Sequence, residues 1–383
     1  MAEAVNRRGR SLRTDEAQPV TFVELFFDLV FVFAVTQLTG LLASDLTPGG
    51  LLRAILLGWL IWWAWTQFTW TLNPADTTHP AVRVITLAAS GVALVMAASV
   101  PRAFAEDALW FAVPYVIVRG LGLGIQLQVE RERPDSNLRG VGLWASFSMI
   151  GLGLVVVGAV VEPGLRQFLW LATVVADLVA AAVAGRGAEW DIKTAHFSER
   201  HGLFVIIALG ESIILAGTAV AADERSAALA SVAAAAILVV CLLWWTYFGW
   251  LKEALEQRFG AAPIARLGPL ARDAFSVAHF PLIGGIVGFA VAVEAILAHP
   301  ADPAPRAVVA ALGVGIALFV LCSALSLRIL GGPLLTVRLV VIAAMAVGLI
   351  VVAGMAPVWS LAVVALALLA ITLAERGRGA HIG

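Results

Sequence analysis

Charged residues are scarce in this chain, and their scarcity excludes a soluble globular protein. Lys, Arg, Asp and Glu make up 13% of the 383 residues, whereas roughly a quarter of the residues of a soluble domain are charged. Hydrophobic residues account for 61% of the sequence, and the mean hydropathy is +0.94. The apolar runs recur at about 20 residues, which is the length of a helix that crosses a bilayer. The sequence therefore predicts an all-α polytopic membrane protein.

Cysteine, lysine and phosphate-binding motifs are also sparse. The two cysteines, Cys241 and Cys322, lie inside apolar runs, where a small hydrophobic role is favoured over a disulfide or a metal site. The two lysines stand among many arginines, a bias typical of a GC-rich bacterial genome. The sequence contains no G-x-x-x-x-G-K-[ST] loop. We therefore expect no cofactor, no metal and no nucleic-acid partner, and energy for any transport would come from ion gradients.

Hydropathy and the Pro/Gly turns divide the chain into about twelve predicted spans. They lie near residues 22–43, 50–72, 82–100, 107–129, 139–161, 165–185, 200–222, 227–250, 275–298, 306–327, 336–355 and 357–374.

The distribution of basic residues predicts the orientation of these spans. With the N-terminus in the cytoplasm, nineteen Lys and Arg residues fall on the cytoplasmic side and five on the outside. This asymmetry fits the positive-inside rule. We therefore expect both termini in the cytoplasm of a bacterial cell, with the chain in the inner membrane and its lipid bilayer as partner. A homo-oligomer is a further possibility.

Two tryptophan-rich segments indicate an internal duplication. Residues 65–70 and 245–250 share the pattern W-T-x-F-x-W, and Gln37 and Glu211 occupy equivalent places in the preceding spans. Because six spans per half is an even number, the repeats would share one orientation, as in parallel-repeat transporters. The alternative is that Trp-rich interfacial belts resemble each other by composition. The predicted organisation is a basic cytoplasmic tail at 1–20, six-helix repeats at 21–185 and 200–375, a cytoplasmic linker at 186–199 and a cytoplasmic tail at 376–383.

Several charged residues fall inside the predicted spans, where a charge costs several kcal/mol unless it faces a partner or a cavity. Glu24 and Asp28 are four residues apart and share one helix face. Glu211 lies close to the expected midplane, Arg119 lies in the middle of its span and Asp177 lies well inside another. The candidates for a transport site or an ion-pair network are Glu24, Asp28, Gln37, Arg119, Asp177, Glu199, Arg200, His201 and Glu211.

Two interpretations of these charges remain open. In the first, Arg119 pairs with Asp28 or Glu211 and only permits tight helix packing. In the second, the acids line a cavity and bind a proton or another cation, as intramembrane carboxylates commonly do.

The segment H-F-S-E-R-H at residues 196–201 does not match the inverted zincin pattern H-x-x-E-H, because Arg200 intrudes. We predict a cytoplasmic entry to a helix, with His196 and Arg200 on one face. His201 or Glu199 could relay protons toward Glu211. Most of the tryptophans, among them Trp62, Trp63, Trp65, Trp70, Trp244, Trp245 and Trp250, are predicted to be membrane-interface anchors, with an aromatic ligand cage as the alternative.

Two motifs carry a family resemblance. The segments V-E-L-F-F-D-L-V-F-V-F-A-V at 23–35 and H-F-S-E-R-H-G-L-F-V-I-I-A-L-G-E-S-I at 196–213 resemble the bacterial low temperature requirement protein A family. The resemblance extends from about residue 20 to 375. It implies a multi-pass bacterial membrane protein and marks Glu24, Asp28, Glu199, Arg200, His201, Gly210 and Glu211 as matching positions.

A looser similarity links F-F-D-L-V-F to the F-S-D motif of a lysosomal and bacterial potassium channel family, with Phe27 where that family has Ser. The function expected from the sequence is transport of a small solute or ion through intramembrane carboxylates, without a catalytic residue. The alternatives are an ion channel, a membrane scaffold, or an intramembrane enzyme in which His201 and Glu199 would meet a metal or acyl substrate.

Overall fold

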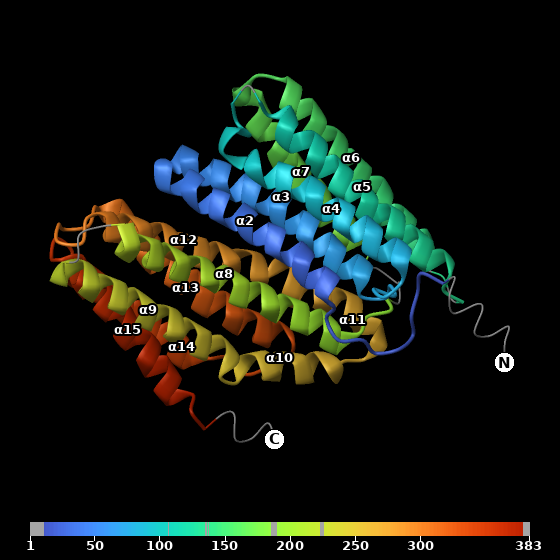
Figure 1. Ribbon diagram of the computed structural model, residues 1–383. Coiled ribbons are helices and arrows are strands. Elements are labelled where there is room, and N and C mark those ends of the chain that lie inside the picture. Colours follow the sequence, from blue (N-terminus) through green and yellow to red (C-terminus); the bar gives the residue numbers. More distant parts are fainter. Residues whose placement is uncertain are drawn as a thin grey trace. The chain divides into compact units, whose positions relative to one another are not determined.

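A computed structural model describes residues 11–105, 107–134, 136, 138–184, 190–222 and 226–377. The described residues form helices joined by short loops, with one isolated bridge between Arg13 and Ala75 and no sheet (Figure 1). The basic residues counted above at positions 7, 8, 10, 186, 225 and 378 lie outside the described residues, as do parts of both predicted tails and of the linker. The prediction of an all-α polytopic membrane protein is confirmed.

Two compact units divide the chain, and each is described by itself. Unit 1 comprises Met1–Leu38, Leu52–Arg200 and Ala262–Arg272, and unit 2 comprises Thr39–Leu51, His201–Ala261 and Asp273–Gly383. The division between them therefore passes through helices α2, α3 and α8.

Unit 1 is built on α3 and the helices around it. Within it, α4 packs on α5, α5 on α6 and α6 on α7. It holds most of α2 (Phe22–Ser44) and α3 (Pro48–Leu72), together with α4 (Pro80–Ala98), η1 (Val100–Arg102), α5 (Leu109–Arg131), α6 (Leu138–Val160), α7 (Pro163–Ala184), the start of α8 (Thr194–Ala222) and α11 (Ile264–Leu270).

Unit 2 is built on the pairing of α12 with α13, and α15 packs on both α9 and α14. Its helices are most of α8, α9 (Ala227–Phe248), α10 (Leu251–Gly260), α12 (His279–Ala298), α13 (Arg306–Ile329), α14 (Thr336–Val351) and α15 (Pro357–Ala374). A π-helical turn, η2 (Ala271–Val277), precedes α12, and its first two residues, Ala271 and Arg272, belong to unit 1. Glycine allows α12 and α13 to approach closely, because a Cβ atom on Gly285 would lie 2.5 Å from the carbonyl oxygen of Gly315.

Each predicted span overlaps a helix of the structure. Eleven of the described helical segments are long and apolar enough to cross a membrane, and α14 is a shorter apolar helix that ends at Val351 rather than near residue 355. The span predicted to begin near residue 275 begins at Ile264, because α11 and η2 precede α12 in one continuous helical segment that ends at Ala298. Helix α8 begins at Thr194, so that residues 194–199 of the predicted linker are helical.

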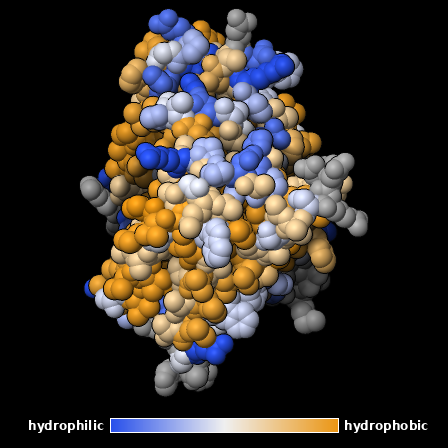
Figure 2. Space-filling model, turned by 90° about the vertical axis from the view of Figure 1, so that its left-hand side faces the viewer, coloured by the Kyte–Doolittle hydropathy of each residue, from blue (hydrophilic) through white to orange (hydrophobic). Residues whose placement is uncertain are grey.

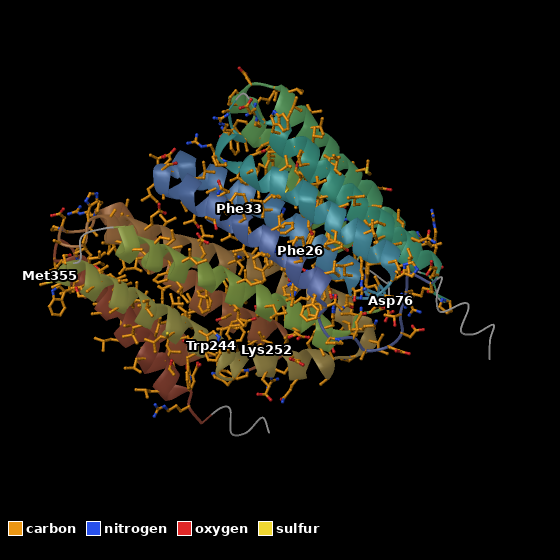
Figure 3. All side chains as sticks on the ribbon, viewed as in Figure 1. Phe26, Phe33, Asp76, Trp244, Lys252 and Met355 are labelled. Carbon is orange, nitrogen blue, oxygen red and sulfur yellow. The ribbon has the colours of Figure 1, made fainter. Side chains whose placement is uncertain are left out.

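Large apolar side chains remain exposed on the helices, as lipid contact requires. Phe26 on α2 is 50% exposed and Trp244 on α9 is 43% exposed. Figure 2 shows apolar residues covering large parts of the face that it draws. In Figure 3, Trp244 lies near the end of α9, close to Lys252 on α10.

Candidate functional site: a buried acid and arginine cluster in unit 1

The acids at the start of α2 face the first turns of α8. Glu24 and Asp28 are separated by one helical turn, and neither is exposed. His196 and Arg200 are likewise one turn apart on α8, so that each acid meets a basic side chain. The Nε2 atom of His196 lies 3.1 Å from Oε1 of Glu24, and Arg200 forms ion pairs with both acids. We refer to Glu24, Asp28, His196 and Arg200 as the acid cluster.

The remaining face of α2 points away from this cluster. Phe26, which Figure 3 labels on the same helical turn, is half exposed. Phe27 is fully buried. The predicted common face of Glu24 and Asp28, and that of His196 and Arg200, are both present.

Asp28 is held at one carboxylate oxygen only. Its Oδ1 atom accepts a hydrogen bond from the indole N–H of Trp65 at 2.7 Å and another from Nη2 of Arg200. Its Oδ2 atom is buried and has no hydrogen-bond partner among the described residues. An unpaired buried oxygen is costly. Oδ2 is therefore one of two carboxylate oxygens of this cluster at which a proton or another cation would be stabilising, and Oε1 of Glu24 is the other.

Glu24 has more contacts than Asp28, and its Oε1 atom is likewise buried without a hydrogen-bond partner among the described residues. Its Oε2 atom accepts hydrogen bonds from the backbone N–H and the hydroxyl of Thr21, at 2.9 and 2.8 Å. Its other oxygen faces His196 and the Nη1 atom of Arg200. Glu24 therefore accepts its hydrogen bonds through Oε2, and its Oε1 atom makes only ion-pair contacts.

Asn73 fixes the tautomer of His196. Its Oδ1 atom accepts from the backbone N–H of Lys193 at 2.8 Å, and its Nδ2 atom donates to the backbone oxygen of Lys193 at 3.0 Å. These two bonds set the orientation of the amide, because a backbone N–H only donates and a carbonyl only accepts. The same Nδ2 atom lies 3.2 Å from Nδ1 of His196, which must therefore accept. The imidazole is neutral in this arrangement, and its proton is on Nε2, toward Glu24.

The charges of the cluster do not balance. Two ionised carboxylates face one guanidinium, and the imidazole is neutral, so that the formal sum is −1. All four side chains are at most 2% exposed, and an unbalanced charge is costly in such a site. The cluster therefore has a place for one additional positive charge, which a proton on a carboxyl group would supply.

Arg119 belongs to a second, separate group of unit 1. It lies 3.4 Å from Oδ1 of Asp177, and it donates to the hydroxyls of Tyr115 at 2.7 Å and Ser148 at 3.4 Å. Trp59 donates to the other oxygen of Asp177 at 3.4 Å. The expected pairing of Arg119 with Asp28 or Glu211 is thus wrong, because α7 brings Asp177 to Arg119 while Arg200 neutralises Asp28.

The other predicted residues are dispersed. Gln37 on α2 and Glu199 on α8 are half buried. In unit 2, His201 packs its ring against Phe275 and His279, and buried Glu211 lies within electrostatic reach of Glu294.

The tryptophans of α3 are core residues and not interface anchors. Trp62, Trp63 and Trp65 are at most 4% exposed, since neighbouring helices enclose this part of α3. The interface assignment fits the exposed Trp244 and Trp245 of α9. Sequence reasoning also missed Asn73. The polar pair Asn73 and His196 could not be found by spacing, because 123 residues separate them.

A cavity of about 50 Å³ lies beside the acid cluster in unit 1. One face of α3 contributes Trp63, Thr66, Gln67 and Trp70, which follow helical spacing. The rest of the wall comes from α5, α6, α7, α11 and η2 and from Trp190. A second cavity of about 20 Å³ shares Trp70, Gln126 and Trp190 with it and reaches Asn73. The neighbouring cavity is therefore lined in part by the residue that holds His196.

Lys193 and Arg13 form a polar layer next to Asn73, outside the predicted spans. The ammonium of Lys193 donates to the backbone oxygen of Thr14 at 2.8 Å, and Arg13 pairs with Asp191 at 2.7 Å. Burial lowers the pKa of Lys193 below its usual range, although the nearby carboxylate of Asp191 opposes this effect. The layer ties the segment before α8 to the N-terminal segment.

The fold and this site define a polytopic helical membrane protein with buried ionisable groups inside its helices. A family model described as bacterial low temperature requirement A protein (LtrA) matches residues 19–373. The chain belongs to the LtrA family. It is 30% identical over 308 residues to the uncharacterized protein RA0937 of Rhizobium meliloti (strain 1021), which covers 78% of this chain and 75% of the relative. No solved structure shows significant similarity.

Proposed function

We propose that this protein moves a small solute or ion across the bacterial inner membrane and that the acid cluster binds and releases a proton during that cycle. The observation that carries the proposal is the unbalanced charge of the cluster, together with the unpaired Oδ2 atom of Asp28. Buried ionisable residues of membrane helices commonly mark ion and proton pathways.

The construction of the cluster supports a proton on Asp28 rather than on its neighbours. Glu24 accepts two hydrogen bonds from Thr21 through Oε2, and its Oε1 atom, which has no hydrogen-bond partner among the described residues, lies 3.1 Å from Nε2 of His196 and 3.5 Å from Nη1 of Arg200. His196 accepts from Asn73. Asp28 has a free oxygen, and a proton there would leave one carboxylate and one guanidinium. Loading and unloading this site changes the charge of the cluster between 0 and −1.

The basic residues of the loops support an orientation with both termini in the cytoplasm. In that orientation, Glu24 and His196 lie in the first turns of α2 and α8, at the cytoplasmic ends of these helices. The acid cluster and the Trp-lined cavity would then be reached from the cytoplasm.

Proton and potassium flux in proteoliposomes tests the proposal. Wild-type protein, Asp28→Asn and the exposed control Asp107→Asn are compared under an imposed pH gradient and an imposed potential. Asn retains an oxygen that accepts from Trp65 and Arg200, so we expect Asp28→Asn to fold. We expect it to lose proton movement, whereas Asp107→Asn keeps it.

A second measurement separates the proton site from flux itself. Infrared difference spectroscopy of purified protein detects the C=O stretch of a protonated carboxyl group as the pH is changed. We expect a titrating band in wild type that Asp28→Asn removes. Equal proton flux in Asp28→Asn and wild type, or an unchanged band, contradicts the proposal.

A further inference from the structure

The cavity beside α3 contains polar atoms that the protein itself does not satisfy. The Oγ1 atom of Thr66 and the Oε1 atom of Gln67 are buried without a hydrogen-bond partner among the described residues, and each side chain is 2% exposed. Both residues line the cavity. The amide orientation of Gln67 is set, because its Nε2 atom donates to the backbone oxygen of Arg119 at 2.8 Å. Its Oε1 atom is therefore an acceptor that requires a donor.

The aromatic walls of the cavity favour a positive charge. Four tryptophans line it, namely Trp63, Trp70, Trp144 and Trp190. The faces of indole rings attract ammonium groups, and Trp is the best aromatic residue for this interaction. An ammonium group with N–H donors would meet both the aromatic faces and the acceptor oxygens of Thr66 and Gln67.

Arg272, in the wall of the same cavity, favours a negatively charged group on the ligand. It is the one described residue of the cavity wall with a formal charge, and its Nη1 atom donates to the backbone oxygen of Ala181, another wall residue, at 3.2 Å. A guanidinium in the wall opposes a ligand that is only a cation and favours a carboxylate, which it recognises well. A ligand with both an ammonium and a carboxylate group satisfies the two ends together.

The size of the cavity restricts this class further. A volume of about 50 Å³ has room for roughly three to five water-sized groups. Trp190 is held close by Gly268, where a Cβ atom would lie 2.6 Å from its ring. We infer that this cavity binds a small zwitterion that carries an ammonium and a carboxylate group, of the size of glycine.

The experiment measures equilibrium binding to purified full-length protein in detergent, without a membrane gradient, so its result is independent of the flux proposed above. Radiolabelled glycine is the probe, and methylammonium, acetate and leucine are competitors. We expect glycine to bind, methylammonium and acetate to compete at least tenfold more weakly than glycine, and leucine not to compete.

Thr66→Val is the decisive variant. The hydroxyl of Thr66 makes no hydrogen bond to any described residue, so its replacement by a methyl group should not destabilise the fold. We expect this variant to unfold at the wild-type temperature or above and to bind glycine several-fold more weakly. Thr69→Val is the matched control, because Thr69 lies on the same helix and donates within it to the backbone oxygen of Trp65.

A second variant tests the carboxylate end. Arg272→Gln is expected to weaken glycine binding at least tenfold and to strengthen methylammonium binding, because the positive charge that opposes a cation is removed. Equally strong competition by methylammonium would make the cavity a cation cage, and equally strong competition by acetate would make it an anion site. Either result overturns the inference, as do wild-type glycine binding in Thr66→Val and the absence of glycine binding to wild type.

Discussion

Two buried arginines, one in each unit, meet acids in opposite ways. Arg338 of unit 2 forms a bidentate pair with Glu375, at 3.0 and 2.8 Å, and its remaining N–H groups reach Ser323 and backbone oxygens. Trp250 donates to the same carboxylate at 2.9 Å. Arg200 of unit 1 instead forms one ion pair with Glu24 and another with Asp28. Its Nε atom has no acceptor among the described residues.

The difference separates a structural pair from a site that can titrate. Arg338 and Glu375 balance each other in charge and use their hydrogen-bonding groups, so an added proton would only break the pair. The acid cluster has one acid in excess and two buried carboxylate oxygens, Oε1 of Glu24 and Oδ2 of Asp28, without a hydrogen-bond partner among the described residues. Burial and a Trp N–H donor are common to both sites, and the number of acids per arginine distinguishes them.

The largest effect is expected when the balanced pair is broken. Arg338→Gln leaves the carboxylate of Glu375 buried beside Trp250, and loss of one partner of a buried pair costs about 3–5 kcal/mol. Unfolding of the purified protein in detergent should show this loss. Arg306→Gln, at an exposed arginine that begins helix α13 of the same unit, is the control. Equal stability of the two variants would show that the pair contributes little.

Neutralising an acid should cost little stability in the acid cluster, whereas it should destabilise the pair of Arg338 and Glu375. Asp28→Asn removes the excess charge and is expected to change the free energy of unfolding at neutral pH by less than about 1 kcal/mol. Glu375→Gln should lose about 1.5–3 kcal/mol, because hydrogen bonds to charged groups are lost. The same unfolding measurement compares them, and a larger loss in Asp28→Asn would remove the proposed distinction between the sites.

Asn73 should control the protonation pattern of His196. We expect nitrogen NMR of the labelled protein to show a neutral His196 with its proton on Nε2, since Nδ1 accepts from Asn73. In Asn73→Leu this donor is absent, and a second tautomer should become populated. Gln18→Leu, which removes a hydrogen bond to the backbone of Ala75, is the control and should leave the His196 signals unchanged. A single Nδ1-protonated form in wild type would contradict the charge count of the cluster.

The smallest effect concerns the polar layer outside the spans. Because burial lowers the pKa of Lys193, acylation of this amine should reach its half-maximum at a lower pH than in an unstructured peptide. The folded state then binds fewer protons than the unfolded state between the two pKa values, so that stability rises with pH in that window below about 10.4. Mass spectrometry of the labelled protein measures the first effect, with Lys252→Arg used to remove the other lysine. A half-maximum at or above the peptide value would contradict the buried environment.

The class of fold and the two common faces of the acid cluster followed from the sequence. Apolar runs of membrane length specify helices because lipid cannot hydrogen bond to the backbone. Glu24 with Asp28, and His196 with Arg200, lie one turn apart, so helical geometry alone put each pair on one face. The six-helix repeat is a prediction that still rests on the shared tryptophan pattern.

Partners across helices could not be predicted in the same way. Arg119 meets Asp177 and not Asp28, and Asn73 meets His196 across 123 residues. Nor could burial of the α3 tryptophans be foreseen, since an indole ring suits both a membrane interface and a protein core.

The sequence by itself determined that this chain is helical, spans a membrane and carries acids within its spans, because backbone hydrogen bonding in lipid and local helical periodicity are short-range constraints. Only the tertiary structure decided which acid meets which arginine, that Asp28 retains an unpaired oxygen and that four tryptophans surround a cavity. These features depend on which faces of distant helices pack together, and the sum of many side-chain contacts decides that packing.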